Sequence, residues 1–300
     1  ERATARLLRP GRSHCTPQPR ALSRRCMQAF KASLRSLPSS GRVQLQTDQA
    51  TGVAVLTLRN EARRNALCGT MMIQLADAVH ELESWKQGVA LVVTGAGRAF
   101  CAGADLHLAQ KVINTPEQGQ LMSELMSETL DRIAQLPMIS VCAVNGAAFG
   151  GGAELTTATD WRVFASGATA RFVQTQMAVS TGWGGAGRLT GIVGRRQALR
   201  LFLHSPLIDA EAALASGLAD AVAPEGVNPA DAAMELFVTP ALRAAGSRAA
   251  IRSIKAAVAA HSSVSAGARR AETQAFASVW ASADNLRAVQ KALERAPSKV

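Results

Sequence analysis

The stretch VNGAAFGGGAELTTATD, residues 144–160, places three consecutive glycines just before a carboxylate, Glu154, in a run with almost no other charge. Glycine lets a backbone approach a ligand closely, and a helix that begins there leaves its first N–H groups without partners. Such N–H groups can stabilise an oxygen that gains negative charge during a reaction. The stretch therefore predicts a glycine junction after a strand, followed by a helix that carries an acid beside a binding site.

A second glycine-rich junction, GAGRAFCAGADL at residues 95–106, follows the apolar run ALVVT just as the first follows SVCAV. Glycine-rich loops are mostly turns, so either junction alone is weak evidence for a site. Two N–H groups, one from each junction, that point to the same place would form an oxyanion hole. The dipole of the helix that follows the three glycines would strengthen such a hole.

Short apolar runs alternate along the chain with segments of helical spacing. Strand, helix, strand, helix and strand in this order predict an α/β layered core. From residue 210 onward the sequence is rich in alanine and predicts helices, with turn signals at Gly217 and Gly246. The predicted strands are residues 53–58, 89–95, 139–146 and 160–166, and the predicted helices are residues 71–85 and 121–136.

The positive charge is concentrated at the start of the chain. The 300 residues carry a net charge of +11, but ten basic residues and a single acid lie within residues 1–42. The remainder is nearly neutral, which argues against nucleic-acid binding, and no apolar run reaches the ~18 residues that a membrane-spanning helix needs. The arginine-rich, acid-poor tail is typical of a mitochondrial transit peptide, and a disordered basic arm is the alternative. We therefore expect the mitochondrial matrix, with the cytosol as the alternative location.

The five cysteines are scattered and show neither metal-ligand spacing nor a disulfide framework. Cys101 and Cys142 lie in apolar runs, where cysteine behaves as a small core residue. The sequence therefore predicts no metal site and fits a reducing compartment.

Four motifs follow one another in a fixed order: RRNAL at residues 63–67, AFCAGADL at 99–106, NGAAFGGGAEL at 145–155 and WGGAGRL at 183–189. Their order and spacing resemble the enoyl-CoA hydratase/isomerase family, the crotonases, over about residues 45–225. The resemblance implies an α/β crotonase (ClpP-like) spiral of repeated ββα units with a C-terminal helical trimerisation region. We accordingly divide the chain into a basic extension at residues 1–42, a crotonase core at 43–225 and a helical region at 226–300.

The resemblance also implies roles for particular residues. The N–H groups of Ala104 and Gly151 would form the oxyanion hole, and Glu154 would be the catalytic acid. The substrate would be an acyl-CoA thioester, no metal or redox cofactor would be needed, and the chain would form a homotrimer or a dimer of trimers. The residues expected to contact the substrate or its CoA group are Arg63, Arg64, Ala66, Ala102, Gly103, Gly150, Gln176 and Trp183. For Arg63 and Arg64 the alternative is a solvated surface charge, and for Trp183 it is packing in the core.

Hydration and decarboxylation differ in the acids that they require. Hydratases of the family have a second glutamate in the segment that here reads RFVQTQM, residues 171–177, where the matching residue is Gln176. An amide can orient water but cannot readily supply a proton, so ordinary hydration is disfavoured. Decarboxylation needs a stabilised enolate and one delivered proton, and several segments of this chain resemble the decarboxylating members of the family.

We therefore expect an acyl-CoA decarboxylase that acts on ethylmalonyl-CoA or methylmalonyl-CoA, with Glu154 kept protonated by burial. Two alternatives remain: a hydratase or isomerase that uses a single carboxylate, and a non-catalytic CoA-binding protein. His107, two residues after Asp105, is expected to face away from the site.

Overall fold

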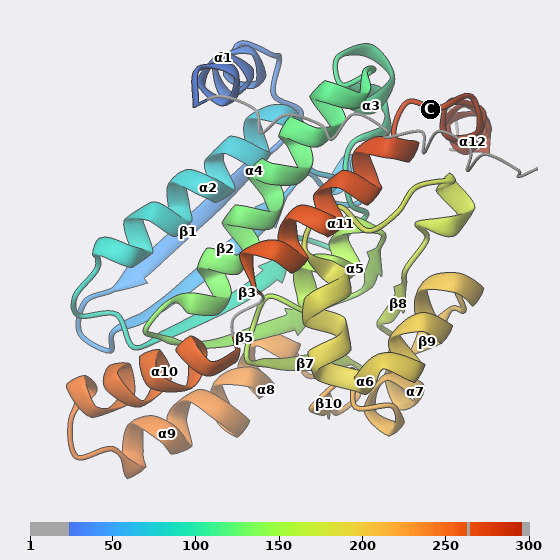
Figure 1. Ribbon diagram of the computed structural model, residues 1–300. Coiled ribbons are helices and arrows are strands. Elements are labelled where there is room, and N and C mark those ends of the chain that lie inside the picture. The colour runs from blue at the N-terminus through green and yellow to red at the C-terminus, as the bar shows by residue number, and fades with distance from the viewer. Residues whose placement is uncertain (1–23, 263–264, 296–300) are drawn as a thin grey trace, which may run out of the picture.

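The structure is a computed structural model that describes residues 24–262 and 265–295. Within these residues the strands form a six-stranded and a four-stranded sheet, and helices cover them (Figure 1). The strands are β1 (Arg42–Asp48), β2 (Val53–Arg59), β3 (Ala90–Gly95), β4 (Ala99–Cys101), β5 (Ile139–Val144), β6 (Ala147–Phe149), β7 (Trp161–Ala165), β8 (Thr169–Arg171), β9 (Ile208–Asp209) and β10 (Ala221–Ala223). The larger sheet has the order β1-β2-β3-β5-β7-β10, and the smaller has the order β4-β6-β8-β9.

The chain winds as a spiral because each repeated unit gives one strand to each sheet. The pairs β3–β4, β5–β6 and β7–β8 are successive units, and their strands pair in parallel within each sheet. The turn within a unit is tight: a Cβ atom at Gly146, between β5 and β6, would overlap the carbonyl oxygen of Arg98 from the preceding unit. Parallel stacking of these units confirms the predicted α/β crotonase spiral.

The two faces of the larger sheet bury side chains against different helices. These are α1 (Arg24–Arg35), α2 (Gly69–Ser84), α3 (Leu106–Lys111), α4 (Pro116–Gln135), α5 (Gly151–Thr156), α6 (Gly185–His204), α7 (Ala210–Ala215), α8 (Pro229–Ala233), α9 (Thr239–Ala244), α10 (Arg248–Ser262), α11 (Ala266–Val279) and α12 (Ala283–Arg295), with short helical turns η1 (Glu61–Arg63), η2 (Thr175–Met177) and η3 (Met234–Val238). Leu91 and Val93 of β3 share a core with α2 and α4, whereas Val92 shares a core with α8 and α10. Burial on both faces explains why these strands are continuous apolar runs.

The predicted strands and helices are all present, with boundaries that differ by a few residues. The helix predicted over residues 121–136 begins earlier, at Pro116, because Thr115 caps it. The Thr115 hydroxyl accepts from the N–H of Gln118 at 3.2 Å, and the Gln118 side chain accepts from the N–H of Thr115 at 3.2 Å. This capping box lies outside the apolar periodicity that predicted the helix.

The second half of the basic extension packs against the core. Helix α1 buries Phe30 and Leu34 against α2 and α4, and Arg35 forms an ion pair with Asp77 of α2 at 3.0 Å. Residues 1–23 of the predicted transit peptide lie outside the described residues.

The C-terminal helices fold back onto the core of the same chain. Helix α11 runs beside α4 (Figure 1), and α12 contacts α3 and η2. The Asn285 side chain donates to the carbonyl oxygen of Met177 at 2.8 Å.

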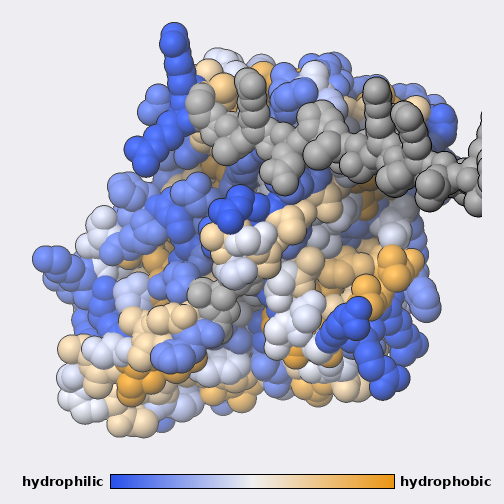
Figure 2. Space-filling view, viewed as in Figure 1, coloured by the Kyte–Doolittle hydropathy of each residue, from blue (hydrophilic) through white to orange (hydrophobic). Residues whose placement is uncertain are grey.

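Figure 2 shows a hydrophobic area over α9 and α10, where Ile254 and Val258 are exposed. In the part of the chain that the structure describes, no helix is both long and apolar enough to cross a membrane.

Candidate active site

Glu154 lies in α5 and is buried, with 3% of its surface exposed. Its Oε2 accepts hydrogen bonds from the backbone N–H groups of Trp183 and Gly185, both at 2.9 Å. Its Oε1 accepts from Nε2 of Gln174 at 2.7 Å. Both oxygens of the predicted catalytic acid are therefore held by neighbouring segments of the chain.

The buried position changes the protonation of Glu154. Burial raises its pKa to about 7, and the nearby charge of Glu272 contributes to the rise. Hydrogen bonds from Gln174 and Trp183 and the charge of Arg188 act in the opposite direction. A carboxyl group with this pKa is present in both its neutral and ionised forms near neutral pH, as a proton donor requires.

The two glycine junctions touch each other. A Cβ atom at Gly103 would lie 3.1 Å from the backbone nitrogen of Gly151, and a Cβ atom at Gly152 would overlap the carbonyl oxygen of Cys101. Gly103 has a φ of +92° and Gly150 has a φ of +55°, values that glycine adopts without strain. Side chains on Gly103 and Gly152 would hold the junctions apart, which accounts for a glycine on each side.

The N–H groups of Ala104 and Gly151 donate no hydrogen bond within residues 24–262 and 265–295. Ala104 forms a parallel bridge with Leu67, in which Leu67 donates to Gly103 at 2.8 Å and Asp105 donates to Leu67 at 3.0 Å. The N–H group of Ala104 itself then points away from Leu67. Gly151 is the first residue of α5 and has no acceptor within its helix. Two unused donors thus lie on loops that touch.

Asn65 holds the RRNAL segment against the first junction. Its Nδ2 donates to the carbonyl oxygens of Ala96 at 2.8 Å and Ala99 at 2.7 Å, and its Oδ1 accepts from the N–H of Asn60 at 2.8 Å. Its φ of +55° lies in a region that asparagine tolerates better than most residues. The sequence reasoning missed this positioning residue, although the asparagine within RRNAL was the available signal.

The predicted CoA-binding residues near the first junction differ in their surroundings. Arg63 forms an ion pair with the buried Asp105 at 2.6 Å, whereas Arg64 is exposed. Ala66 is buried, and the N–H of Ala102 donates to the carbonyl oxygen of Arg64 at 2.9 Å. Arg64 is therefore the exposed member of the arginine pair, and the N–H group of Ala102 is already used within the chain.

Gln176 and His107 face solvent, and neither contacts Glu154. Gln176 lies on η2 with an exposed side chain, while Gln174, two residues earlier, is buried and binds Glu154. Within the segment RFVQTQM, the polar side chain beside the acid is thus Gln174 and not the expected Gln176. His107 is exposed as expected and lies 3.5 Å from Asp105.

Trp183 connects the acid to the second junction. A Cβ atom at Gly151 would lie 2.5 Å from the Trp183 ring, so the indole packs directly on this glycine. The N–H of Trp183 donates to Glu154. Trp183 is buried and therefore belongs to the core as well as to the surroundings of the acid.

An ion-pair network around the buried Arg188 supports the Trp183 loop. Arg188 donates to the carbonyl oxygen of Trp183 and forms an ion pair with Asp131 at 2.7 Å. Asp131 also pairs with Arg269 of α11 at 2.6 Å. The position of the loop that binds Glu154 thus depends on side chains from α4, α6 and α11.

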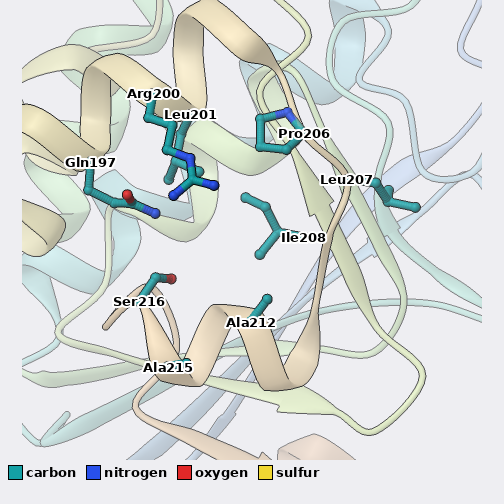
Figure 3. A pocket seen from close by; sticks show the side chains of 9 residues that line it. All are labelled: Gln197, Arg200, Leu201, Pro206, Leu207, Ile208, Ala212, Ala215 and Ser216. Carbon is teal, nitrogen blue, oxygen red and sulfur yellow. The ribbon is translucent and has the colours of Figure 1, made fainter.

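Other chemical features lie elsewhere. A groove of about 590 Å³ lies between α6 and α7, lined by residues including Arg200, Leu207 and Ile208 (Figure 3), and shares no residue with the site of Glu154. Cys101 and Cys142 are fully buried core residues as predicted, and burial raises the pKa of Cys101 to about 12. Among the residues that the structure describes, no three His, Cys, Asp or Glu side chains are grouped as metal ligands.

Comparison with known proteins identifies relatives over most of the chain. The family model described as enoyl-CoA hydratase/isomerase matches residues 48–299. Ethylmalonyl-CoA decarboxylase of Danio rerio is 42% identical over 253 residues, 83% of this chain and 83% of the relative, and the enzyme of that name from Rattus norvegicus is 44% identical over 209 residues, 70% of this chain and 68% of the relative. The crystal structure of an enoyl-CoA hydratase/isomerase from Mycobacterium paratuberculosis has a TM-score of 0.73 at 22% identity, covering 85% of this chain and 99% of that one. This structural likeness shows that the two proteins share a fold.

Proposed function

Because this chain belongs to the enoyl-CoA hydratase/isomerase family, we propose that it is an acyl-CoA decarboxylase acting on ethylmalonyl-CoA and methylmalonyl-CoA. Relatives that carry the name ethylmalonyl-CoA decarboxylase support this choice within the family. The observation that carries the proposal is the buried Glu154, whose pKa is raised to about 7 beside two touching glycine junctions.

In the first step of the proposed reaction, the bond between C2 and the substrate carboxylate breaks. Carbon dioxide leaves, and the electron pair moves through C2 into the thioester carbonyl, so that its oxygen becomes an enolate oxygen. The unused N–H groups of Ala104 and Gly151 donate to this oxygen. One such donor is typically worth ~10²–10³ in rate, so the pair provides the main stabilisation of the enolate.

In the second step, the neutral carboxyl group of Glu154 gives its proton to C2. The products are the shortened acyl-CoA and carbon dioxide, and the Glu154 carboxylate regains a proton from solvent. The hydrogen bonds from Trp183 and Gly185 stabilise the carboxylate that forms. This sequence uses backbone donors and one acid, and it calls on no metal or redox group.

The exposed Arg64 is the proposed contact for a CoA phosphate, because Arg63 is already paired with Asp105. Gly103 and Gly150 let the backbone approach the acyl group, and Trp183 forms one wall beside Gly151. Ala66 and Ala102 contribute backbone groups nearby. The substrate would therefore be bound mostly by main chain near its thioester and by charge at its far end.

We also propose a homotrimer or a dimer of trimers, which sedimentation equilibrium of the purified protein would detect. Large apolar side chains exposed on neighbouring elements support self-association, because exposed apolar surface is common at protein–protein interfaces. On α6, α7 and the segment between them they are Leu199, Leu203, Leu207 and Leu214.

For location, we propose the mitochondrial matrix, supported by the arginine-rich start of the chain. Because Phe30 and Leu34 of α1 are buried, we expect that a leader removed by cleavage would end before α1. Fusion of residues 1–42 to a fluorescent protein tests targeting, and a cytosolic signal would contradict it.

The direct test of function compares two substrates with purified protein. We expect release of carbon dioxide from ethylmalonyl-CoA and little hydration of crotonyl-CoA. Glu154→Gln keeps the size of the side chain but removes the proton donor, so we expect at least about a hundredfold loss of product formation with retained CoA binding. Brisk hydration without carbon dioxide release would favour the hydratase alternative, and CoA binding without turnover would favour a non-catalytic protein.

A further inference from the structure

Two consecutive backbone N–H groups in the first turn of α6 each donate a hydrogen bond to a glutamate carboxylate. Gly185 donates to Oε2 of Glu154 at 2.9 Å, and Ala186 donates to Oε1 of Glu272 at 3.3 Å. Glu154 comes from α5 in the spiral core, whereas Glu272 comes from α11 in the C-terminal helical region. Both carboxylates thus meet the positive end of the same helix.

Helix α11 also packs on the loop that precedes α6. A Cβ atom at Gly182 would lie 2.5 Å from the ring of Phe276. The hydroxyl of Ser123 donates to the carbonyl oxygen of Gly182 at 2.6 Å and lies 3.4 Å from the hydroxyl of Thr273. The packing of α11 therefore fixes the position of Glu272 beside the N–H group of Ala186.

The charges around Glu154 come from three helices. Arg188 of α6 is paired with Asp131 of α4, which is shared with Arg269 of α11. Strands β4 and β6, which pack on α5, carry no charged side chain. Glu272 forms no ion pair among the described residues. In this part of the chain, no arginine, lysine or histidine side chain therefore pairs with the carboxylate of Glu272.

We propose that Glu272 is a positioning residue that keeps Glu154 protonated for proton transfer to C2 of the enolate. The inference rests on the function proposed above. A like charge nearby raises the pKa of a carboxyl group, and burial raises it further. Glu154 is the more buried of the two, and its pKa is raised first by burial and then by the charge of Glu272.

The test removes the charge of Glu272 while preserving its shape. Glu272→Gln can still accept from Ala186, so the loop should keep its position. We expect the pKa of Glu154 to fall by about one unit in this variant. The pKa is read by 13C NMR of protein labelled at glutamate Cδ, and Glu154→Gln identifies the resonance. This readout does not require turnover.

The activity arm follows kcat for carbon dioxide release against pH. The neutral form of Glu154 is the reactive one, so kcat falls as pH rises through its pKa. In Glu272→Gln this falling limb should move to lower pH by about one unit, which lowers kcat about tenfold above that pKa and leaves it unchanged well below. Loss of packing would instead lower kcat at every pH.

Two control variants separate charge from structure. Glu272→Asp keeps the charge and should retain the wild-type pKa of Glu154 and the wild-type pH profile. Glu294→Gln makes the same charge change at an exposed residue of α12 and should move neither. Thermal unfolding of all variants monitors the fold.

If the pKa of Glu154 is the same in Glu272→Gln as in the wild type, the inference is overturned. It is also overturned if this pKa falls but the pH at which kcat declines does not change. If the wild-type protein releases no carbon dioxide from ethylmalonyl-CoA, the proposed function fails. The titration then still decides whether Glu272 controls the proton on Glu154.

Discussion

Gln174 donates its side-chain N–H to Glu154 at 2.7 Å, while its own buried carbonyl oxygen has no partner in the described part of the chain. In this orientation the amide suits the ionised form of Glu154. Rotation of the amide by half a turn would present the carbonyl oxygen, which could accept the proton of the neutral form. Gln174 can therefore bind Glu154 before and after proton transfer.

Replacement of Gln174 by leucine should raise the pKa of Glu154 by about one unit, because the ionised form loses a charge-assisted hydrogen bond. The falling limb of kcat against pH should then move upward, opposite to the shift expected for Glu272→Gln. The matched control is Gln176→Leu, the same change two residues away on an exposed side chain. Equal effects of the two substitutions would contradict the role of Gln174.

A methyl group at Gly151 should disrupt the site, because its Cβ atom would lie 2.5 Å from the Trp183 ring. We expect Gly151→Ala to cost about 1–3 kcal/mol in the free energy of unfolding and most of the activity. Gly191→Ala is the control, since a Cβ atom there meets nothing within 4 Å and the residue lies in α6. It should be neutral or stabilising by up to about 1 kcal/mol. Urea unfolding measures both, and a fully stable, active Gly151→Ala would refute the packing argument.

Substitutions of the adjacent residues Arg63 and Arg64 should have different effects, one on stability and the other on substrate binding. Arg64→Met should raise KM for acyl-CoA about tenfold with little change in stability, because the side chain is exposed. Arg63→Met removes the guanidinium group that pairs with the buried Asp105 at 2.6 Å and should lower the melting temperature. Repeating the KM measurement with an acyl-pantetheine, which lacks the CoA phosphates, should abolish the Arg64 effect. Persistence of that effect would show that Arg64 does not act on a phosphate.

Glu154 should make the stability of the fold depend on pH. Its folded-state pKa of about 7 lies above the ordinary 4.5, so the folded state binds the extra proton between these values. The free energy of unfolding should therefore fall as pH rises from about 4.5 to about 7, by about 3 kcal/mol from this residue alone. Glu154→Gln removes this contribution and should be more stable than the wild type at pH 8. Parallel pH dependences of the two proteins in urea unfolding would disprove the raised pKa.

The sequence predicted the spiral core well because its strands are buried on both faces. Strands β3 and β5 are continuous apolar runs, and the glycine junctions after them stand out against that background. Strands β4, β6 and β8 were not predicted, because three residues are too few to show a periodicity. Their existence follows from the winding of the chain, which the family resemblance implied.

The acid was predictable, but its partners were only partly so. Glu154 follows three glycines in a recognisable motif. Gln174 was missed because the motif directed attention to Gln176, and only the three-dimensional path of η2 shows which side chain turns inward. Glu272 carries no motif of its own and reaches the site through the packing of α11 on α4. Such long-range contacts depend on tertiary structure that local sequence patterns do not record.

The most direct test of the account is a crystal structure of the protein with butyryl-CoA, the decarboxylation product of ethylmalonyl-CoA. We predict that the thioester oxygen lies about 3 Å from the backbone nitrogens of both Ala104 and Gly151, with C2 facing the carboxyl group of Glu154. A thioester oxygen bound away from these two nitrogens, or a Glu154 separated from C2 by another side chain, would contradict it.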